Sequence, residues 1–257
     1  MALHDTQALD LLRLQVEWGA DEALEDAPVD RLRPPVPRPA EHARHTPPAP
    51  ASRLTPAERA VAAAGATATL AELRAAIAMF DGCALRDTAA SLVFAEGDPA
   101  TGLLLIGDPP GESEERSGAP FAGPGGALLE RMLLSIALTR RDLMLAPLIP
   151  WRPPGGRPPS TAEIAVCLPF LHRLIVLSGP RRIILAGALP ARTLLGSVRR
   201  RTTPSWIEVT VPGRPDPIPC LAMPSPASVM QTPAARQEAW AALRLLRRTL
   251  DRDIAEK

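Results

Sequence analysis

The residues best placed to do chemistry follow a short apolar run, Leu103 to Gly107. Asp108 comes directly after this run, and the chain then passes through a Pro/Gly turn and an acidic loop to Phe121, which lies between small residues. A helical pattern starts near Gly125, and the first turn of a helix offers free backbone N–H groups to a ligand. A carboxylate, an aromatic ring and free amides together predict a site built on a strand end.

The elements that would position this site alternate along the chain. Four short apolar runs predict strands at 103–107, 143–148, 182–186 and 218–223, and helical patterns lie at 125–137, 161–177, 189–195 and 233–250. This alternation predicts an α/β fold, a three-layer α/β/α sandwich with a central four-stranded, largely parallel sheet. Such sheets bind ligands beyond the carboxyl ends of their strands, and Asp108, Pro147 and Met223 fall there.

The chain divides into three parts by composition. Residues 1–30 carry apolar residues near helical spacing and predict a helical appendage. Residues 31–56 are dense in Pro, Ala and Arg with no apolar face to bury, which is typical of a linker. Residues 57–257 are expected to form the main domain, which opens with one or two Ala-rich helices.

Composition bounds the class of protein. Three scattered cysteines in 257 residues argue against a secreted disulfide framework, and the acidic start MALHDTQALD lacks the pattern of a signal peptide. No apolar run approaches the length of a bilayer-spanning helix, so we expect a cytoplasmic monomer with no membrane partner. The net charge of +1 neither demands nor excludes nucleic acid, because binding needs only a local basic face.

Two segments carry a resemblance to a known family. They are LLLIGDPPGESEERSGAPFAGPGGALLERML, from Leu103, and WRPPGGRPPSTAEIAVCLPFL, from Trp151. Together they resemble the signature of the family-4 uracil-DNA glycosylases, with ordered matches that include Gly107, Pro110, Gly111, Glu115, Pro120, Phe121, Gly126, Trp151, Arg152, Arg157 and Cys167. The resemblance implies DNA as the partner, uracil-containing or damaged, and a base pocket at Gly107, Pro110, Gly111, Phe121 and Pro147. In the family the aromatic residue at Phe121 stacks on uracil; the alternative is an ordinary core phenylalanine.

The sequence departs from the family pattern at the residues that contact the base. Pro147 stands where the family has the Asn that reads uracil, and proline offers neither an amide nor a backbone N–H. Met223 stands where the family has the His that stabilises the departing base, and a thioether cannot donate a hydrogen bond. Asp108 replaces the family Glu and could still position water, or it could cap the following turn. The chain contains no Asn, and its only His beyond residue 45 is His172, inside an apolar helical pattern.

The family also carries an iron–sulfur cluster on four cysteines. Here the first position falls on Phe80, the second on Cys83, the third on Cys167 and the fourth near Ile183. Four thiolates cannot be assembled from the three cysteines of this chain, so we predict no cluster and no metal. Cys83 and Cys167 are then remnants of a cluster site, and with Cys220 they are expected to pack as small apolar side chains.

Several residues could contact DNA phosphates. Arg152 and Arg157 lie on a Pro-rich loop, Arg199, Arg200 and Arg201 form the densest basic cluster, and Ser225 belongs to the late loop that contains Met223. Clusters of Arg are often merely solvated. Val229 and Met230 lie where a wedge into the duplex would be expected, although packing explains them equally well.

Three hypotheses follow. The first is a superfamily member in DNA base-excision repair that has lost most or all excision but keeps a DNA surface. The second is an active glycosylase with altered base preference that uses Asp108 and main-chain donors. The third is a partner-binding pseudoenzyme whose amino-terminal segment recruits a repair protein. Loss of both the Asn and the His favours the first over the second.

Overall fold

The computed structural model describes residue 14, residues 54–196 and residues 203–255. The predicted appendage and nearly all of the linker lie outside these residues, as do Arg199, Arg200 and Arg201. Ser52–Lys257 forms one compact unit, and every element below belongs to it.

A five-stranded sheet forms the centre of this unit. Its strands are β1 Leu103–Gly107, β2 Met144–Pro147, β3 Arg182–Ala186, β4 Trp206–Val209 and β5 Ile218–Met223, in the order β2-β1-β3-β5-β4. The four expected strands are confirmed and are mutually parallel, whereas the expected count of four was wrong, because β4 adds an antiparallel edge beside β5. β4 carries only four residues, of which one is buried, so it presents no apolar run in the sequence.

The strand registers bring the carboxyl ends of the parallel strands level. Gly107 pairs with both Pro147 and Ala186, and Ala186 pairs with Met223. All five residues of β1 are buried, as expected for a central strand covered on both faces. The loops that follow these strands therefore meet at one edge of the sheet.

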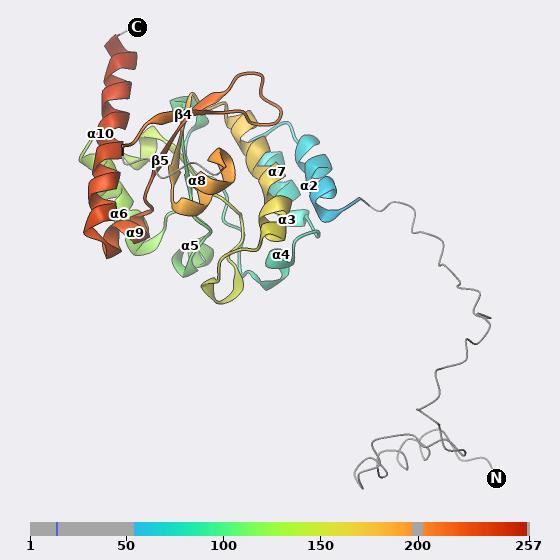
Figure 1. Ribbon diagram of the computed structural model, residues 1–257. Helices are drawn as coiled ribbons and strands as arrows, with labels where there is room; N and C mark the ends of the chain where they lie inside the picture. The colour runs from blue at the N-terminus through green and yellow to red at the C-terminus, as the bar shows by residue number, and fades with distance from the viewer. Residues whose placement is uncertain (1–13, 15–53, 197–202, 256–257) are drawn as a thin grey trace, which may run out of the picture. The chain divides into compact units, whose positions relative to one another are not determined.

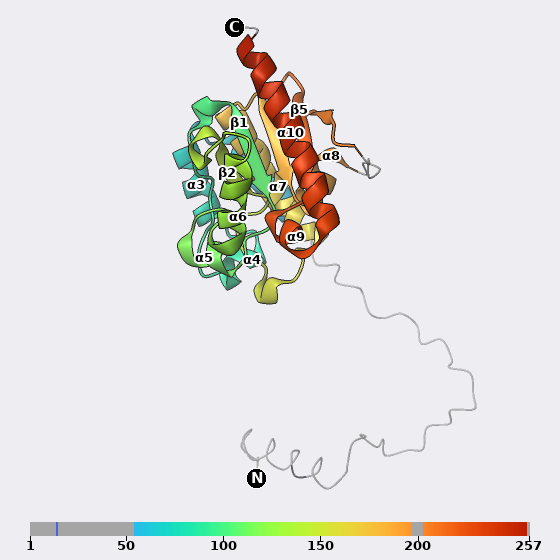
Figure 2. The ribbon, with the colours of Figure 1, turned by 90° about the vertical axis from the view of Figure 1, so that its left-hand side faces the viewer.

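Helices cover both faces of the sheet, which confirms the three-layer sandwich. The helices are α2 Pro56–Gly65, α3 Leu70–Met79, α4 Ala84–Thr88, α5 Glu112–Ser117, α6 Gly123–Leu134, α7 Thr161–Ser178, α8 Ala188–Leu195, α9 Pro226–Gln231 and α10 Pro233–Ala255. Figures 1 and 2 show α2, α3 and α7 on one face and α6, α9 and α10 on the other. The short α5 and α9 were not expected, because six residues are too few to show a helical period.

The helix α7 corrects one expectation. It begins with a capping box between Ser160 and Glu163 and is long and apolar enough, by composition, to cross a membrane. Seven of its residues are buried in the domain, and it packs against α2 and α3. The absence of such a run was therefore predicted wrongly, and the apolar character of α7 has its explanation in the core that it helps to form.

Two aromatic side chains pack together in the helical layer that contains α7. The Phe80 ring meets the Phe170 ring edge to face with centroids 5.1 Å apart, and the Arg59 guanidinium lies 5.7 Å from the Phe80 centroid. Phe80 is 7% exposed and Phe170 is 2% exposed. This pair fixes the segment after α3 onto the core helix.

We predict that Phe80→Ala lowers the free energy of unfolding by about 3–5 kcal/mol, because it leaves a cavity beside Phe170. Urea denaturation measures the change. The neighbouring residue Met79 is 77% exposed and provides the control, since Met79→Ala should change stability by less than about 0.5 kcal/mol. Equal effects of the two substitutions would contradict the packing role of Phe80.

Candidate functional site

A pocket of about 310 Å³ opens at the carboxyl edge of the sheet. Six residues selected from the sequence line it: Asp108, Pro110, Gly111, Phe121, Pro147 and Ser225. Other lining residues come from the start of α5, the start of α6, the end of β3 and the start of α9. The structure thus brings together residues that lie more than one hundred positions apart in the chain, and we call this cavity the strand-end pocket.

Phe121 is held against the end of β1. A Cβ atom at Gly107 would overlap the Phe121 ring, so only glycine permits this close approach. The guanidinium of Arg140 donates to the carbonyl oxygens of Pro120, at 2.6 Å, and of Phe121, at 3.3 Å. Phe121 has a positive φ of 54°, a conformation that costs a non-glycine residue about 1–3 kcal/mol and is concentrated at functional sites. Its half-buried ring lines the pocket and also packs against the core beneath α6 and α10.

Asp108 turns toward the helix that follows β3. A Cβ atom at Gly187, the residue before α8, would overlap the Asp108 carboxylate. Burial raises the pKa of Asp108, while hydrogen bonds from the Ser225 hydroxyl and the Leu189 amide and the charge of Arg192 act in the opposite direction. Asp108 therefore lies at the amino terminus of α8, where a carboxylate is favoured. Asp108 also lines the strand-end pocket. Its carboxylate therefore faces α8 and the pocket, and does not mainly cap the turn that follows it in the chain.

Pro147 ends β2 and Met223 ends β5, two strands that are separated by β1 and β3, and the two side chains face different cavities. Pro147 is half-buried at the end of β2 and lines the strand-end pocket without a polar group to offer. Met223 is 4% exposed, packs in the cluster beneath α6 and α10, and lines a second cavity. Its carbonyl accepts a hydrogen bond from the Gly187 amide at 2.9 Å. Neither side chain can hydrogen-bond a base.

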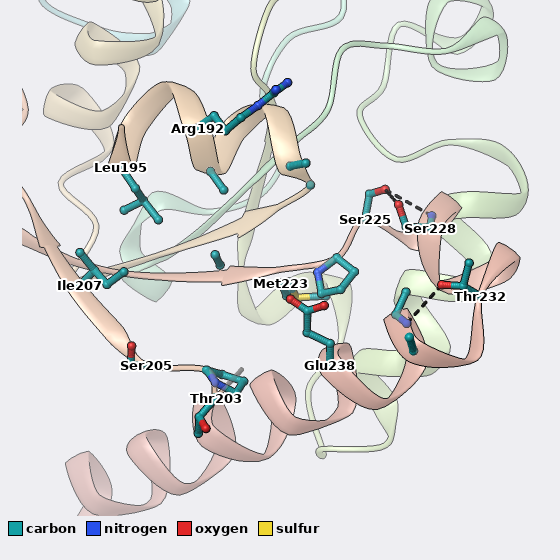
Figure 3. A pocket seen from close by; sticks show the side chains of 18 of the residues that line it. Arg192, Leu195, Thr203, Ser205, Ile207, Met223, Ser225, Ser228, Thr232 and Glu238 are labelled. Atoms are coloured by element: carbon teal, nitrogen blue, oxygen red, sulfur yellow. Dashed lines mark hydrogen bonds between the residues drawn. The ribbon is translucent and has the colours of Figure 1, made fainter. Parts of the chain in front are cut away.

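The second cavity, of about 560 Å³, lies between α8, the edge strand β4, its neighbour β5 and the start of α10. It shares Ser225 with the strand-end pocket. In Figure 3 the Glu238 side chain points from α10 toward Met223, while Arg192 projects away from it. Sequence reasoning missed this cavity because its lining is spread over several elements and contains no motif.

The two loop arginines are engaged within the chain. Arg152 pairs with Glu115 at 3.1 Å, and Glu115 also accepts the Ala90 amide at 2.9 Å. Arg157 pairs with Glu163 at 2.6 Å, and its hydrogen bond lowers the pKa of Glu163 to about 2. These pairs fix the Pro-rich loop to α5 and to α7. Contact of either arginine with DNA stays a prediction.

The three residues predicted to contact DNA in the loop after β5 differ in burial. Ser225 is 6% exposed and accepts the Ser228 amide at the start of α9. Val229 is 6% exposed, whereas Met230 is 52% exposed. Met230 is thus the one of the two apolar residues that is available to a partner, and it lies on the helix whose first residues line the strand-end pocket.

The positions expected for a metal cluster hold an apolar packing site. The Cys83 and Cys167 thiols share a hydrogen bond that lowers the pKa of Cys83 and raises that of Cys167, and both are nearly fully buried. Phe80 fills the first cluster position with its ring, and Ile183 is 0% exposed at the fourth. Within residues 54–196 and 203–255, no three His, Cys, Asp or Glu side chains are grouped as metal ligands. The two thiols of Cys83 and Cys167, with the Phe80 ring at a third ligand position, do not fit a cluster that needs four thiolates.

The remaining titratable candidates lie away from the strand-end pocket. Burial in β5 raises the pKa of Cys220 to about 12, so this thiol is inert. Burial also lowers the pKa of His172, which lies on α7. Neither residue lines the pocket.

Comparison with known proteins agrees with this geometry. The family model described as the Uracil DNA glycosylase superfamily matches residues 94–244. The chain is 35% identical over 132 residues to a type-4 uracil-DNA glycosylase of Pyrobaculum aerophilum, a match that covers 51% of this chain and 67% of that protein.

Two more relatives carry the same name. The protein of Sulfurisphaera tokodaii is 35% identical over 106 residues and that of Thermotoga maritima is 34% identical over 106 residues, each match covering 41% of this chain. The chain spans about half of the length of these two relatives, 48% and 55%. Since the family model matches more than half of its length, and the strand-end pocket lies within that part, the chain belongs to the uracil-DNA glycosylase superfamily.

Proposed function

We propose that this protein acts in DNA base-excision repair as a DNA-binding member of its superfamily in which uracil excision is strongly impaired. One observation carries the proposal. The strand-end pocket keeps the Phe121 wall and space for a flat ring, but Pro147 and Met223 occupy the positions where the family reads the base and assists its departure. A base could stack there without being recognised through its edge.

Typical magnitudes support impairment. Loss of one positioned electrostatic stabiliser costs about 10²–10³ in rate, and proton management by a side chain contributes about 10²–10⁴. Two such losses could remove most of the acceleration, although members of one site are not additive. The position of Asp108 weakens a third contribution, because its carboxylate is directed toward Gly187 at the start of α8.

A second candidate is an active glycosylase with altered base preference. Asp108 lines the pocket, and its raised pKa is typical of carboxyl groups at active sites. The relatives are named uracil-DNA glycosylases, which supports DNA as the partner in both candidates. A third candidate, recruitment of a repair protein by the amino-terminal segment, lies outside the described residues.

The proposal includes three further expectations. The protein is expected to fold without an iron–sulfur cluster, because Phe80 and Ile183 occupy two of the four ligand positions. It is expected to act as a monomer and in the cytoplasm. Iron and sulfide analysis of the purified protein, with size-exclusion chromatography, tests the first two.

We expect no excision of uracil, hypoxanthine or xanthine above background from single-stranded or mismatched oligonucleotides. Gel separation of cleaved strands measures this, and Asp108→Asn serves as the control for a contaminating enzyme. Excision well above background that Asp108→Asn abolishes would replace the first candidate with the second. Excision that survives the substitution would point to contamination.

The Phe121 wall gives a binding prediction. Because stacking of a base on an aromatic ring is worth about 1–3 kcal/mol, Phe121→Ala should weaken binding to a duplex with a G·U mismatch by at least about fivefold. Fluorescence anisotropy measures the affinity, and undamaged duplex of the same length is the reference. If both duplexes lose affinity equally, Phe121 does not receive a flipped base.

Asp108 gives a prediction about pH. Its pKa is raised in the folded state, so ionisation at neutral pH opposes folding. Asp108→Asn keeps the shape and should raise the Tm at neutral pH. This gain should shrink as the pH falls through the folded-state pKa and vanish only well below about 3.9, the pKa of an unfolded Asp, where the wild-type carboxyl is protonated in both states. Thermal melts across this range measure it, with the exposed Asp216→Asn as the control. A gain that does not depend on pH would rule out the carboxyl charge as its cause.

A further inference from the structure

The long carboxy-terminal helix carries a basic outer face. α10, Pro233–Ala255, buries one side through Ala235, Ala239, Ala242, Leu243 and Leu246. The opposite side exposes Trp240, Arg244, Arg248 and Arg252. These four residues follow one another at intervals of four, so they lie along one side of the helix. We call them the α10 outer face.

The arginines of this face are not used to hold the fold. Asp251 pairs with Arg247, and Asp253 pairs with Arg182 on β3. Across the part of the chain that the structure describes, Arg244, Arg248 and Arg252 have no ion pair or side-chain hydrogen bond. Like charges four residues apart on a helix oppose helix formation. The stability of the helix therefore does not explain why three arginines are spaced four residues apart on this face.

Trp240 adds an aromatic surface to the same face. Trp240 is 47% exposed, an unusually large fraction for a tryptophan, which is highly buried on average. Arginines that neutralise phosphates, combined with an aromatic ring on which a base can stack, are the two components of sites for single-stranded nucleic acid. An acidic protein partner would use the arginines but would not need the exposed ring.

The helix that carries the α10 outer face begins shortly after a helix that lines the strand-end pocket. Pro226 and Ala227 of α9 line that pocket, and α10 starts two residues after α9 ends. Figure 2 shows α10 running from α9 along the face of the domain toward the carboxyl terminus. Trp240 is the member of the face nearest to α9 in the chain, and Arg252 lies roughly 18 Å further along the helix axis.

We propose that the α10 outer face binds single-stranded DNA that leaves the strand-end pocket. The face runs away from the carboxyl edge of the sheet. A DNA strand bound along it would therefore lead away from the strand-end pocket. A paired duplex keeps its bases stacked inside, whereas an unpaired strand can present one to Trp240. The choice of DNA as the polyanion rests on the proposed function, but binding at this face requires no damaged base.

The test uses the full chain and a fluorescent oligothymidine with no damaged base. Arg244→Gln, Arg248→Gln and Arg252→Gln are combined in one variant, because glutamine keeps helix propensity while removing charge. The slope of log affinity against log salt should fall by about 2, at about 0.7 per lost phosphate contact on a single strand. Trp240→Ala should weaken binding at least about fivefold, and circular dichroism should show that both variants are folded.

Two comparisons make the result decisive. Arg74 on α3 is also exposed, so Arg74→Gln is the matched control for the single variant Arg248→Gln and should leave binding of oligothymidine unchanged. An unchanged salt slope in the triple variant overturns the proposal. So does a poly-glutamate probe that binds as tightly as oligothymidine and is insensitive to Trp240→Ala, because this result assigns the face to an acidic protein. Phe121→Ala, which tests the strand-end pocket, should not change oligothymidine binding at the α10 outer face, so the two proposals fail separately.

Discussion

The parallel pairing of β1 with β2 and β3 is the constraint on which the rest of the domain depends. It sets Gly107 level with Pro147 and Ala186, and β5 then brings Met223 to the same edge. Because these strands are covered on both faces, their registers are fixed by burial as well as by hydrogen bonds. Most residues that line the strand-end pocket therefore belong to the strand ends or to the segments that follow them, 108–125 and 225–227.

The residues that hold the pocket wall in place differ from the residues whose side chains could contact a bound base. The features that hold the Phe121 wall remain, namely the missing side chain of Gly107 and the donors of Arg140 on the preceding carbonyls. The residues whose side chains would touch a base have become apolar, and Asp108 has its carboxylate at the start of α8. A proline at the end of β2 costs the sheet little, since its ladder ends there. Pro147 therefore removes polar groups from the wall of the strand-end pocket without disturbing the architecture.

The sequence predicted the four parallel strands because each is a short, largely apolar run between turn residues, and three of them, Leu103–Gly107, Arg182–Ala186 and Ile218–Met223, agree to the residue. The sequence did not predict β4, because an edge strand with one buried residue shows no such apolar run. For the site, strand ends predicted Asp108 and Pro147, but no local signal indicates that Gly187 receives the Asp108 carboxylate or that Arg140 holds Phe121. These contacts join segments that only the folded sheet brings together.

Stability and ligand chemistry impose opposite demands on the same positions. Phe80 and Ile183 stabilise the domain by packing, because both side chains are nearly fully buried. At the strand-end pocket, Asp108 keeps a carboxyl that burial disfavours, and Phe121 keeps a backbone conformation that few residues adopt. A domain under no demand except folding would lose both features first. Asp108 and Phe121 therefore keep the shape and polarity of the strand-end pocket at some cost to the stability of the fold.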